Sequence, residues 1–205
     1  MKGSEANMFG FIRIIFWGIV LGIIVLILKK KNRMDKKTVS FSVIAAILFC
    51  TISGIIPIEN YIITFTTPEK AFHYIHPDEV KLVIDGQESS LIIGEESNTD
   101  YIYLIIPKCP DGWKLGRGID TELVAQTTDE DIVINLYHYK ETCDYYITII
   151  DMSGNLTQIV DRCDSAFVTF DNKQLEAEYR CYFAFVCSYD ENYWIKVNNQ
   201  EYRFS

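Results

Sequence analysis

Residues 79–94 read EVKLVIDGQESSLIIG, and this stretch decides the fold of the larger part of the chain. Apolar and polar side chains alternate in its first half, which places Val80, Leu82 and Ile84 on one face of a β-strand. Asp85-Gly86 is a dipeptide typical of tight hairpin turns, and SSLIIG supplies a returning strand. The stretch therefore predicts an antiparallel hairpin.

Short β-type runs continue from this hairpin to the C-terminus. They read YIYLIIP, DIVINLYHY, YYITIID, NLTQIVD, AFVTF, YRCYFAFVCSY and YWIKV, with turns expected at Asp111-Gly112, Ser153-Gly154-Asn155 and Asn198-Asn199. The last pair joins WIKV to QEYRF as a two-residue hairpin. Because no long helical periodicity interrupts these runs, we expect a mainly antiparallel β domain, either a sandwich or a curled sheet.

One short helix is expected immediately before the first strand, over roughly 68–75. Thr66 and Thr67 are both candidates for its N-cap, and Glu69 completes a capping box if Thr66 is the cap. The residue before Pro77 is driven toward an extended conformation, so the helix must end before that proline. We expect this helix to pack at the membrane-proximal end of the β domain.

Two apolar stretches precede the β domain, residues 8–28 and 38–58. The first has Arg13 as its only charge and the second has none; at about 1.5 Å per residue, either can cross a hydrocarbon core of about 30 Å. Each stretch predicts a transmembrane helix, with the long stem of Arg13 reaching the headgroups. Gly18 and Gly22 form a G-x-x-x-G pair that permits close approach of another helix, although such pairs also arise by chance.

The connection at 29–37, KKKNRMDKK, carries six positive charges and one negative charge. Basic residues that flank a span stay in the cytoplasm, so the short tail at 1–7 and the large domain at 59–205 are both predicted to face outward. A cleaved signal peptide is the competing interpretation, but lysines stand where a small-residue cleavage site belongs. The predicted location is the cell membrane, as a multi-pass protein with an extracytoplasmic C-terminal domain.

Charge divides at the same boundary. Residues 1–58 hold eight basic and two acidic side chains, a net charge of +6, and residues 59–205 hold 11 basic and 26 acidic ones, a net charge of −15. Such an acidic domain is repelled by nucleic-acid phosphates, so nucleic acid is excluded as a partner. The expected partners are the membrane and a protein or envelope component outside the cell, and binding of calcium to the acidic surface stays open.

The sequence contains no catalytic, cofactor or metal motif, so we name no residue as a site of these kinds. His73 and His76 stand three residues apart with Asp78 and Glu79 close behind, a spacing that permits a metal site but is far more typical of an ordinary helix end. The third histidine, His138, lies far away in a strand. Acidic runs such as DED at residues 129–131 are typical of solvated turns.

Six cysteines are present: Cys50 in the second apolar stretch and, in the acidic domain, Cys109, Cys143, Cys163, Cys181 and Cys187. An odd number outside leaves at least one free thiol unless two chains pair. Cys181 and Cys187 lie in one strand-like run, about 20 Å apart at about 3.3 Å per residue, which is too far for a mutual disulfide. Free buried thiols and one or two disulfides are both compatible with the sequence.

The runs FTTPEKAFHYIHPDEVKLVIDGQESSLIIG, at 65–94, and YLIIPKCPDGWKLG, at 103–116, carry a family resemblance. They resemble small membrane-anchored proteins of Gram-positive, Clostridium-type bacteria, in which a Pro-Glu-x-Ala-Phe-x-Tyr helix precedes a strand pair and a Gly-Trp-Lys turn, here Gly112, Trp113 and Lys114. The resemblance implies a cell-membrane location and an outward-facing domain. It implies no activity.

The function that these features favour is a non-enzymatic, membrane-tethered binding or sensing domain. A cytoplasmic connection of nine residues has no room for a signalling domain, so a signal must pass through the spans to another membrane protein. The alternative is a membrane-anchored envelope hydrolase that uses two unrecognised carboxylates. That alternative requires two carboxyl groups about 5 to 10 Å apart in one cleft.

Overall fold

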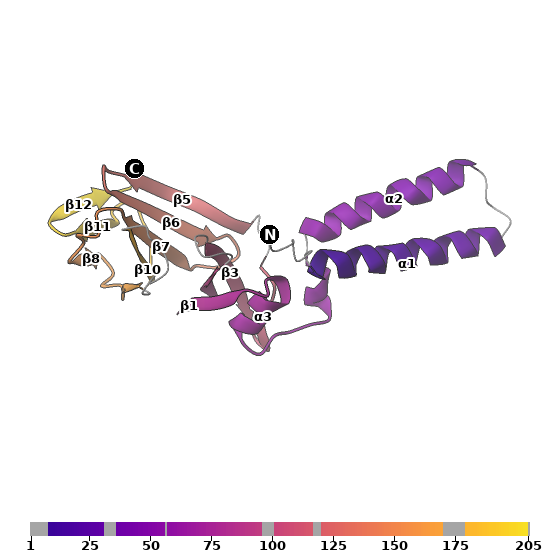
Figure 1. Ribbon diagram of the computed structural model, residues 1–205, viewed down its shortest axis with the longest axis horizontal. Helices are drawn as coiled ribbons and strands as arrows, with labels where there is room; N and C mark the ends of the chain where they lie inside the picture. The colour runs from indigo at the N-terminus through magenta and orange to yellow at the C-terminus, as the bar shows by residue number, and fades with distance from the viewer. Residues whose placement is uncertain are drawn as a thin grey trace, which may run out of the picture.

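The computed structural model describes residues 8–30, 36–55, 57–95, 101–116, 120–169 and 179–204, and the side chains of 8–14, 36, 53–55 and 58 fall outside the description. Two long helices, α1 (Met8–Lys30) and α2 (Lys36–Ile55), lie side by side and extend away from the β-sheets (Figure 1). The Met8 end of α1 and the Ile55 end of α2 both point toward the sheets. Within the described part of the chain, no helix is both long enough and apolar enough to span a membrane.

Helix α2 ends earlier than the apolar stretch at 38–58 suggested. Its last residue is Ile55, and Pro57 has an extended backbone (φ −67°, ψ 96°) that leads into a short 3-10 helix, η1 (Ile58–Tyr61). Proline lacks the N–H that an α-helix requires, and it disfavours α geometry in the residue before it. The chain therefore turns toward the β domain before the apolar stretch is finished.

The short helix α3 (Pro68–Ile75) confirms the single helix expected before the first strand. Its N-cap is Thr67, whose Oγ1 accepts a hydrogen bond from the Lys70 N–H (3.4 Å). The capping box built on Thr66 is wrong, because the Thr66 hydroxyl instead accepts from Lys70 Nζ (2.9 Å). His76 closes the helix as C-cap, with its N–H donated to the Phe72 carbonyl (2.8 Å).

The described strands form three sheets, and every pairing in them is antiparallel. The first sheet contains β1 (Glu79–Asp85), β2 (Ser89–Glu95), β3 (Tyr101–Cys109) and β4 (Gly112–Trp113) in that order. The second has the order β5 (Thr121–Thr128), β6 (Ile132–Tyr139), β7 (Tyr145–Asp151), β10 (Arg180–Val186) and β9 (Val168–Thr169). The third has the order β12 (Gln200–Arg203), β11 (Trp194–Val197) and β8 (Ile159–Asp161). The mainly antiparallel β prediction is confirmed, and one of the sheets curls as a half-barrel.

Alternating side chains build the domain as a stack of layers. Helix α3 covers one face of the first sheet, where Phe72 packs with Ile92 and Ile106. The opposite face packs on the second sheet through a cluster that includes Ile93 and Tyr146. The far face of the second sheet then packs on the third, in a cluster of buried residues that comprises Ile134, Leu136, Ile147, Ile149, Leu156, Ala184, Val186, Tyr193, Ile195, Val197, Tyr202 and Phe204. The central strands β6, β7 and β10 of the second sheet are thus buried on both faces, which explains why they read as nearly continuous apolar runs.

The first hairpin differs from the sequence prediction in its register. A bulge shifts the β1–β2 pairing between Val80 and Leu82, so that Val80 packs on the α3 side of the sheet while Leu82 and Ile84 pack between the first two sheets. The expectation that these three side chains share one face is therefore wrong. A bulge inserts one residue into a strand and reverses the alternation beyond it.

The turn of this hairpin lies at another position than expected. Asp85 pairs with Ser90, and the Gly86 N–H donates to the carbonyl of Ser89, the first residue of β2 (2.9 Å), so Gln87 and Glu88 are the central turn residues and the turn at Asp85-Gly86 is wrong. The buried carboxylate of Asp144 fixes this turn. It accepts hydrogen bonds from the N–H groups of Gln87 (3.1 Å) and Glu88 (2.8 Å) and from the Ser89 hydroxyl (2.8 Å).

Strand β5 is absent from the sequence prediction. It is an edge strand that reads TELVAQTT, and most of its residues are exposed, including Leu123 at 47%. Without a buried face it shows no apolar alternation. The predicted runs at 155–161 and 166–170 shorten to β8 and β9, whereas the Asn198-Asn199 hairpin is confirmed by the pairing of Val197 with Gln200.

Candidate functional site

Four tyrosines gather where the first sheet meets the second. They are Tyr101 and Tyr103 of β3, Tyr137 of β6 and Tyr179 immediately before β10, and we call this group the tyrosine surface. Tyr103 is 43% exposed, and its ring lies 5.9 Å from that of Phe183, measured between centroids. Desolvation raises the pKa of Tyr103, and the neighbouring Cys181 thiol and the other three phenols add to the rise.

Two buried polar side chains lie on the same face of the second sheet. Asn135 and Thr148 are direct partners across β6 and β7, with exposed fractions of 9% and 3%. Asn135 is two residues from Tyr137 on the same strand, and Thr148 is paired with Phe183 of β10. Among the described residues, neither Asn135 Oδ1 nor Thr148 Oγ1 has a hydrogen-bond partner. A buried polar atom without a partner costs about 1–3 kcal/mol, so Asn135 and Thr148 are expected to lower the stability of the second sheet.

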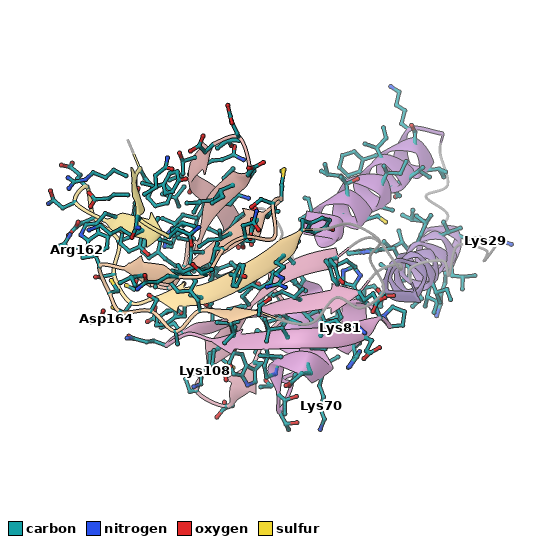
Figure 2. The ribbon with its side chains drawn as sticks, turned by 60° about the vertical axis from the view of Figure 1, so that its left-hand side comes forward. Lys29, Lys70, Lys81, Lys108, Arg162 and Asp164 are labelled. Carbon is teal, nitrogen blue, oxygen red and sulfur yellow. The ribbon has the colours of Figure 1, made fainter. Side chains whose placement is uncertain are left out.

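An ion pair borders the tyrosine surface on the first sheet. Lys81 Nζ lies 2.6 Å from a Glu95 carboxylate oxygen and 3.0 Å from Glu79, and these hydrogen bonds raise the pKa of Lys81. Figure 2 shows Lys81 on β1. The pKa of Tyr101 is raised by desolvation and then by the negative charge of Glu95. The border of the tyrosine surface thus carries both positive and negative charges, while its centre is aromatic.

A hollow lies at the end of the first sheet that is remote from the tyrosine surface. It has a volume of about 440 Å³ and is lined by Gln87, Glu88, Pro107, Lys108, Cys109, Pro110, Glu141 and Thr142. Glu88 Oε2 accepts a hydrogen bond from the Cys143 N–H (2.7 Å), and Lys108 Nζ lies 5.6 Å from the centre of the Trp113 ring. Glu88 and Glu141 are two carboxylates in one hollow, although Glu88 also holds the β6–β7 turn.

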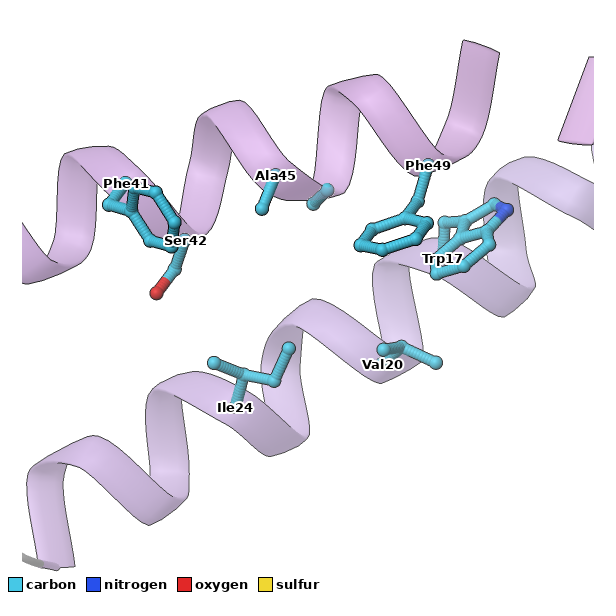
Figure 3. A pocket seen from close by; sticks show the side chains of 8 residues that line it. Trp17, Val20, Ile24, Phe41, Ser42, Ala45 and Phe49 are labelled. Carbon is cyan, nitrogen blue, oxygen red and sulfur yellow. The ribbon is translucent and has the colours of Figure 1, made fainter. Parts of the chain in front are cut away.

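An apolar groove of about 340 Å³ separates α1 from α2 (Figure 3). The stacked rings of Trp17 and Phe49, with centroids 5.7 Å apart, close one end of it. Gly18 and Gly22 do not take part in this packing, because a Cβ built on either glycine meets no atom within 4 Å. The G-x-x-x-G face is therefore open and is not the contact between the two helices.

The histidines weighed as metal ligands pack against aromatic rings. Ring centroids of His73 and His76 lie 5.9 Å and 5.4 Å from that of Phe72, and His138 stacks on Tyr145 at 4.5 Å. Within the described residues, no group of three or more His, Cys, Asp or Glu side chains is arranged to hold a metal ion. The structure does not bring His138 to the other two.

The acidic run at 129–131 belongs to a turn, and Asp129 joins that turn to the third sheet. Its carboxylate accepts hydrogen bonds from the Glu130 N–H (2.8 Å), from Gln200 Nε2 (2.7 Å) and from the Tyr202 hydroxyl (3.3 Å). These bonds, the one from Glu130 first, lower the pKa of Asp129. Asp129 therefore stabilises the turn at 129–131 and links it to the third sheet.

Three other aspartates carry a role that sequence reasoning missed. Asp144, Asp151 and Asp161 are at most 1% exposed, and each accepts backbone N–H groups from a turn. Asp151, for example, binds the N–H groups of Gly154 (3.0 Å) and Leu156 (2.8 Å). Asp151 and Asp161 stand two and four residues before a serine in a turn, which was the available signal for these two. No local signal marks Asp144, because the turn that it binds is 55 to 57 positions away.

No family model, curated protein or solved structure matches this chain. The roles considered for the tyrosine surface and for the hollow beside Lys108 therefore rest on geometry alone.

Proposed function

We propose that this chain is an integral membrane protein, in which α1 and α2 form a transmembrane hairpin and the acidic β domain binds a component of the cell envelope outside the cytoplasm. Three observations support the hairpin. Helix α1 has 23 residues, the basic connection at 29–37 fits the cytoplasmic side, and both helices direct their other ends toward the β domain (Figure 1).

The tyrosine surface is the observation that carries the binding role, because the exposed Tyr103 ring and its three phenol neighbours offer both ring faces and hydroxyls. A ligand that lays an apolar face on Tyr103 and exchanges hydrogen bonds with the Tyr103 hydroxyl fits this surface. Sugars combine hydroxyl donors with an apolar ring face. The domain carries a net charge of −15, which disfavours strongly anionic ligands. We therefore assign an envelope glycan as the ligand class.

Binding is tested with the full-length chain in detergent and soluble peptidoglycan fragments as the probe, by isothermal titration calorimetry. Tyr103→Ala removes the exposed ring and is expected to weaken binding at least about tenfold, because a stacked aromatic anchor is worth on the order of 1–3 kcal/mol. Tyr61→Ala is the matched control, since Tyr61 is 86% exposed but lies in η1. Equal affinity of both variants and the parent would refute the tyrosine surface as the binding site.

The topology has its own test. A reporter enzyme fused after Ser205 is expected to be active outside the cytoplasm, and a cysteine placed within 29–37 is expected to resist a membrane-impermeant maleimide in intact cells. Labelling of that loop together with an inactive reporter would reverse the orientation. This result is independent of whether the tyrosine surface binds a glycan.

The hydrolase alternative is supported by one observation, the two carboxylates in the hollow beside Lys108. Glu88 holds the β6–β7 turn through the Cys143 N–H, so its substitution would disturb that turn. Glu141→Gln is therefore the variant tested, with its Tm as the check that the fold is retained. Release of reducing ends from peptidoglycan by the parent chain, and its loss in Glu141→Gln, would favour hydrolysis over binding alone.

A further inference from the structure

The third sheet and the end of β10 bring two cysteines together that are 24 positions apart in the chain. Cys163 lies in the turn after β8, and Cys187 follows the last residue of β10. The Cys163 thiol donates to the Ser188 carbonyl (3.3 Å) and lies 3.7 Å from the Ser188 hydroxyl. Ser188 directly follows Cys187 in the chain, so these contacts place the Cys163 thiol beside the Cys187 segment. Burial raises the pKa of the Cys163 thiol, and the neighbouring Cys187 thiol adds to the rise.

Several contacts hold the two segments in this arrangement. The Arg162 guanidinium pairs with Asp190, and the Arg162 N–H donates to the Trp194 carbonyl (3.2 Å). The Tyr193 hydroxyl donates to the buried carboxylate of Asp161 (2.6 Å). Figure 2 shows Arg162 and Asp164, which flank Cys163, at the end of the domain remote from α1 and α2. The thiols therefore meet on a fixed scaffold.

We propose that Cys163 and Cys187 form an intramolecular disulfide by exchange with a small or protein disulfide outside the cytoplasm. The Cys187 thiolate, on the exposed residue of the pair, attacks one sulfur of the donor disulfide and releases the first donor thiol. The half-buried Cys163 thiolate then attacks the Cys187 sulfur of the mixed disulfide and releases the second. Two protein thiols are oxidised, the donor disulfide is reduced to two thiols, and the two protons end on the donor.

The bond would tie the third sheet to the central one. β8 belongs to the third sheet and β10 to the second, and the cross-link closes the chain between residues 163 and 187. A cross-link of this loop length restricts the unfolded chain, so oxidation is expected to raise the Tm by about 5–12 °C. The inference uses the outward location of the proposed function only for the source of oxidant in the cell. The chemistry of the pair is testable without it.

The test treats the full-length chain in detergent with oxidised glutathione, blocks remaining thiols with iodoacetamide, and maps peptides without reduction. We expect one cross-linked peptide pair that contains Cys163 and Cys187, and its loss in either Cys163→Ser or Cys187→Ser. Cys181→Ser is the matched control and should retain it, because Cys181 lies six residues before Cys187, within β10 and on the face toward the first sheet.

Alkylation of both thiols after the oxidant, or a separate glutathione adduct on each, would overturn the proposal. A cross-link from Cys187 to a cysteine other than Cys163 would do the same. The Tm of the oxidised parent against the oxidised Cys163→Ser and Cys187→Ser variants gives a second readout, since both variants lack the cross-link but remove different side chains. A failure of glycan binding or of the topology test would leave this result unchanged.

Discussion

At the scale of single residues, two buried hydroxyls in this domain are chemically alike but differently satisfied. Ser89 Oγ donates to Asp144 (2.8 Å) and lies 2.9 Å from the Tyr146 hydroxyl, whereas Thr148 Oγ1 has no partner among the described residues. Their contributions to stability should therefore have opposite signs.

Thr148→Val replaces the unpaired hydroxyl by a methyl group of similar shape and is expected to stabilise the chain by up to about 1 kcal/mol. Ser89→Ala leaves the Asp144 carboxylate short of a donor and is expected to cost about 1–3 kcal/mol. Thermal unfolding of the full-length chain measures both. Destabilisation by Thr148→Val would mean that the Thr148 hydroxyl is satisfied in the folded chain.

At the scale of elements, the docking of α3 on the first sheet depends on a glycine. A Cβ built on Gly94 would lie 2.2 Å from Cζ of Phe72, a ring that is fully buried between α3 and β2. Because Gly94 has no side chain, it leaves the space that the Phe72 ring of α3 occupies.

Gly94→Ala is expected to cost about 1–3 kcal/mol through overpacking, because the buried Phe72 ring has to move. Phe72→Leu shortens the anchor and costs a similar amount alone by leaving a gap. In the double variant the added methyl group occupies part of that gap. A double-mutant cycle should therefore show a loss of stability that is smaller than the sum of the two single losses. Strict additivity would show that the ring and the glycine do not touch.

At the scale of the whole molecule, two buried tyrosines make the stability of the stacked sheets sensitive to alkaline pH. Tyr146 and Tyr193 are at most 1% exposed, and desolvation raises the pKa of each above its ordinary value of 10.0. Above pH 10 the unfolded chain loses these protons and the folded chain keeps them. Stability is therefore fully present below pH 10 and falls as the pH rises toward the folded pKa values.

We expect the two tyrosines together to lower the free energy of unfolding by up to about 3 kcal/mol between pH 10 and pH 11, since each contributes up to about 1.4 kcal/mol per pH unit. Urea midpoints across this range measure the slope. Tyr146→Phe should make the slope shallower, even though it also removes the contact with Ser89. An unchanged slope would place the titrating groups elsewhere.

Local patterns predicted much of the β domain and the short helix. Alternation and turn residues predicted β1, the Asn198-Asn199 hairpin and the helix at Pro68, because these depend on neighbours in the chain. Strand β5 was not predicted, because an exposed edge strand buries no face and shows no apolar periodicity. The position of the hairpin turn at 86–89 was not predicted, because the Asp144 carboxylate, 55 to 57 positions away, fixes it.

Composition and charge by themselves determined the division of the chain into an apolar, basic N-terminal part and an acidic β domain, because both are sums over residues and need no contacts. Only the tertiary structure decided what the polar side chains do. It stacked the sheets so that Asn135 and Thr148 are buried on the same face as Tyr137, and it placed the Cys163 thiol, which follows β8, against Ser188, which directly follows Cys187 after β10. Such sites depend on the register of distant strands, which local periodicity does not specify.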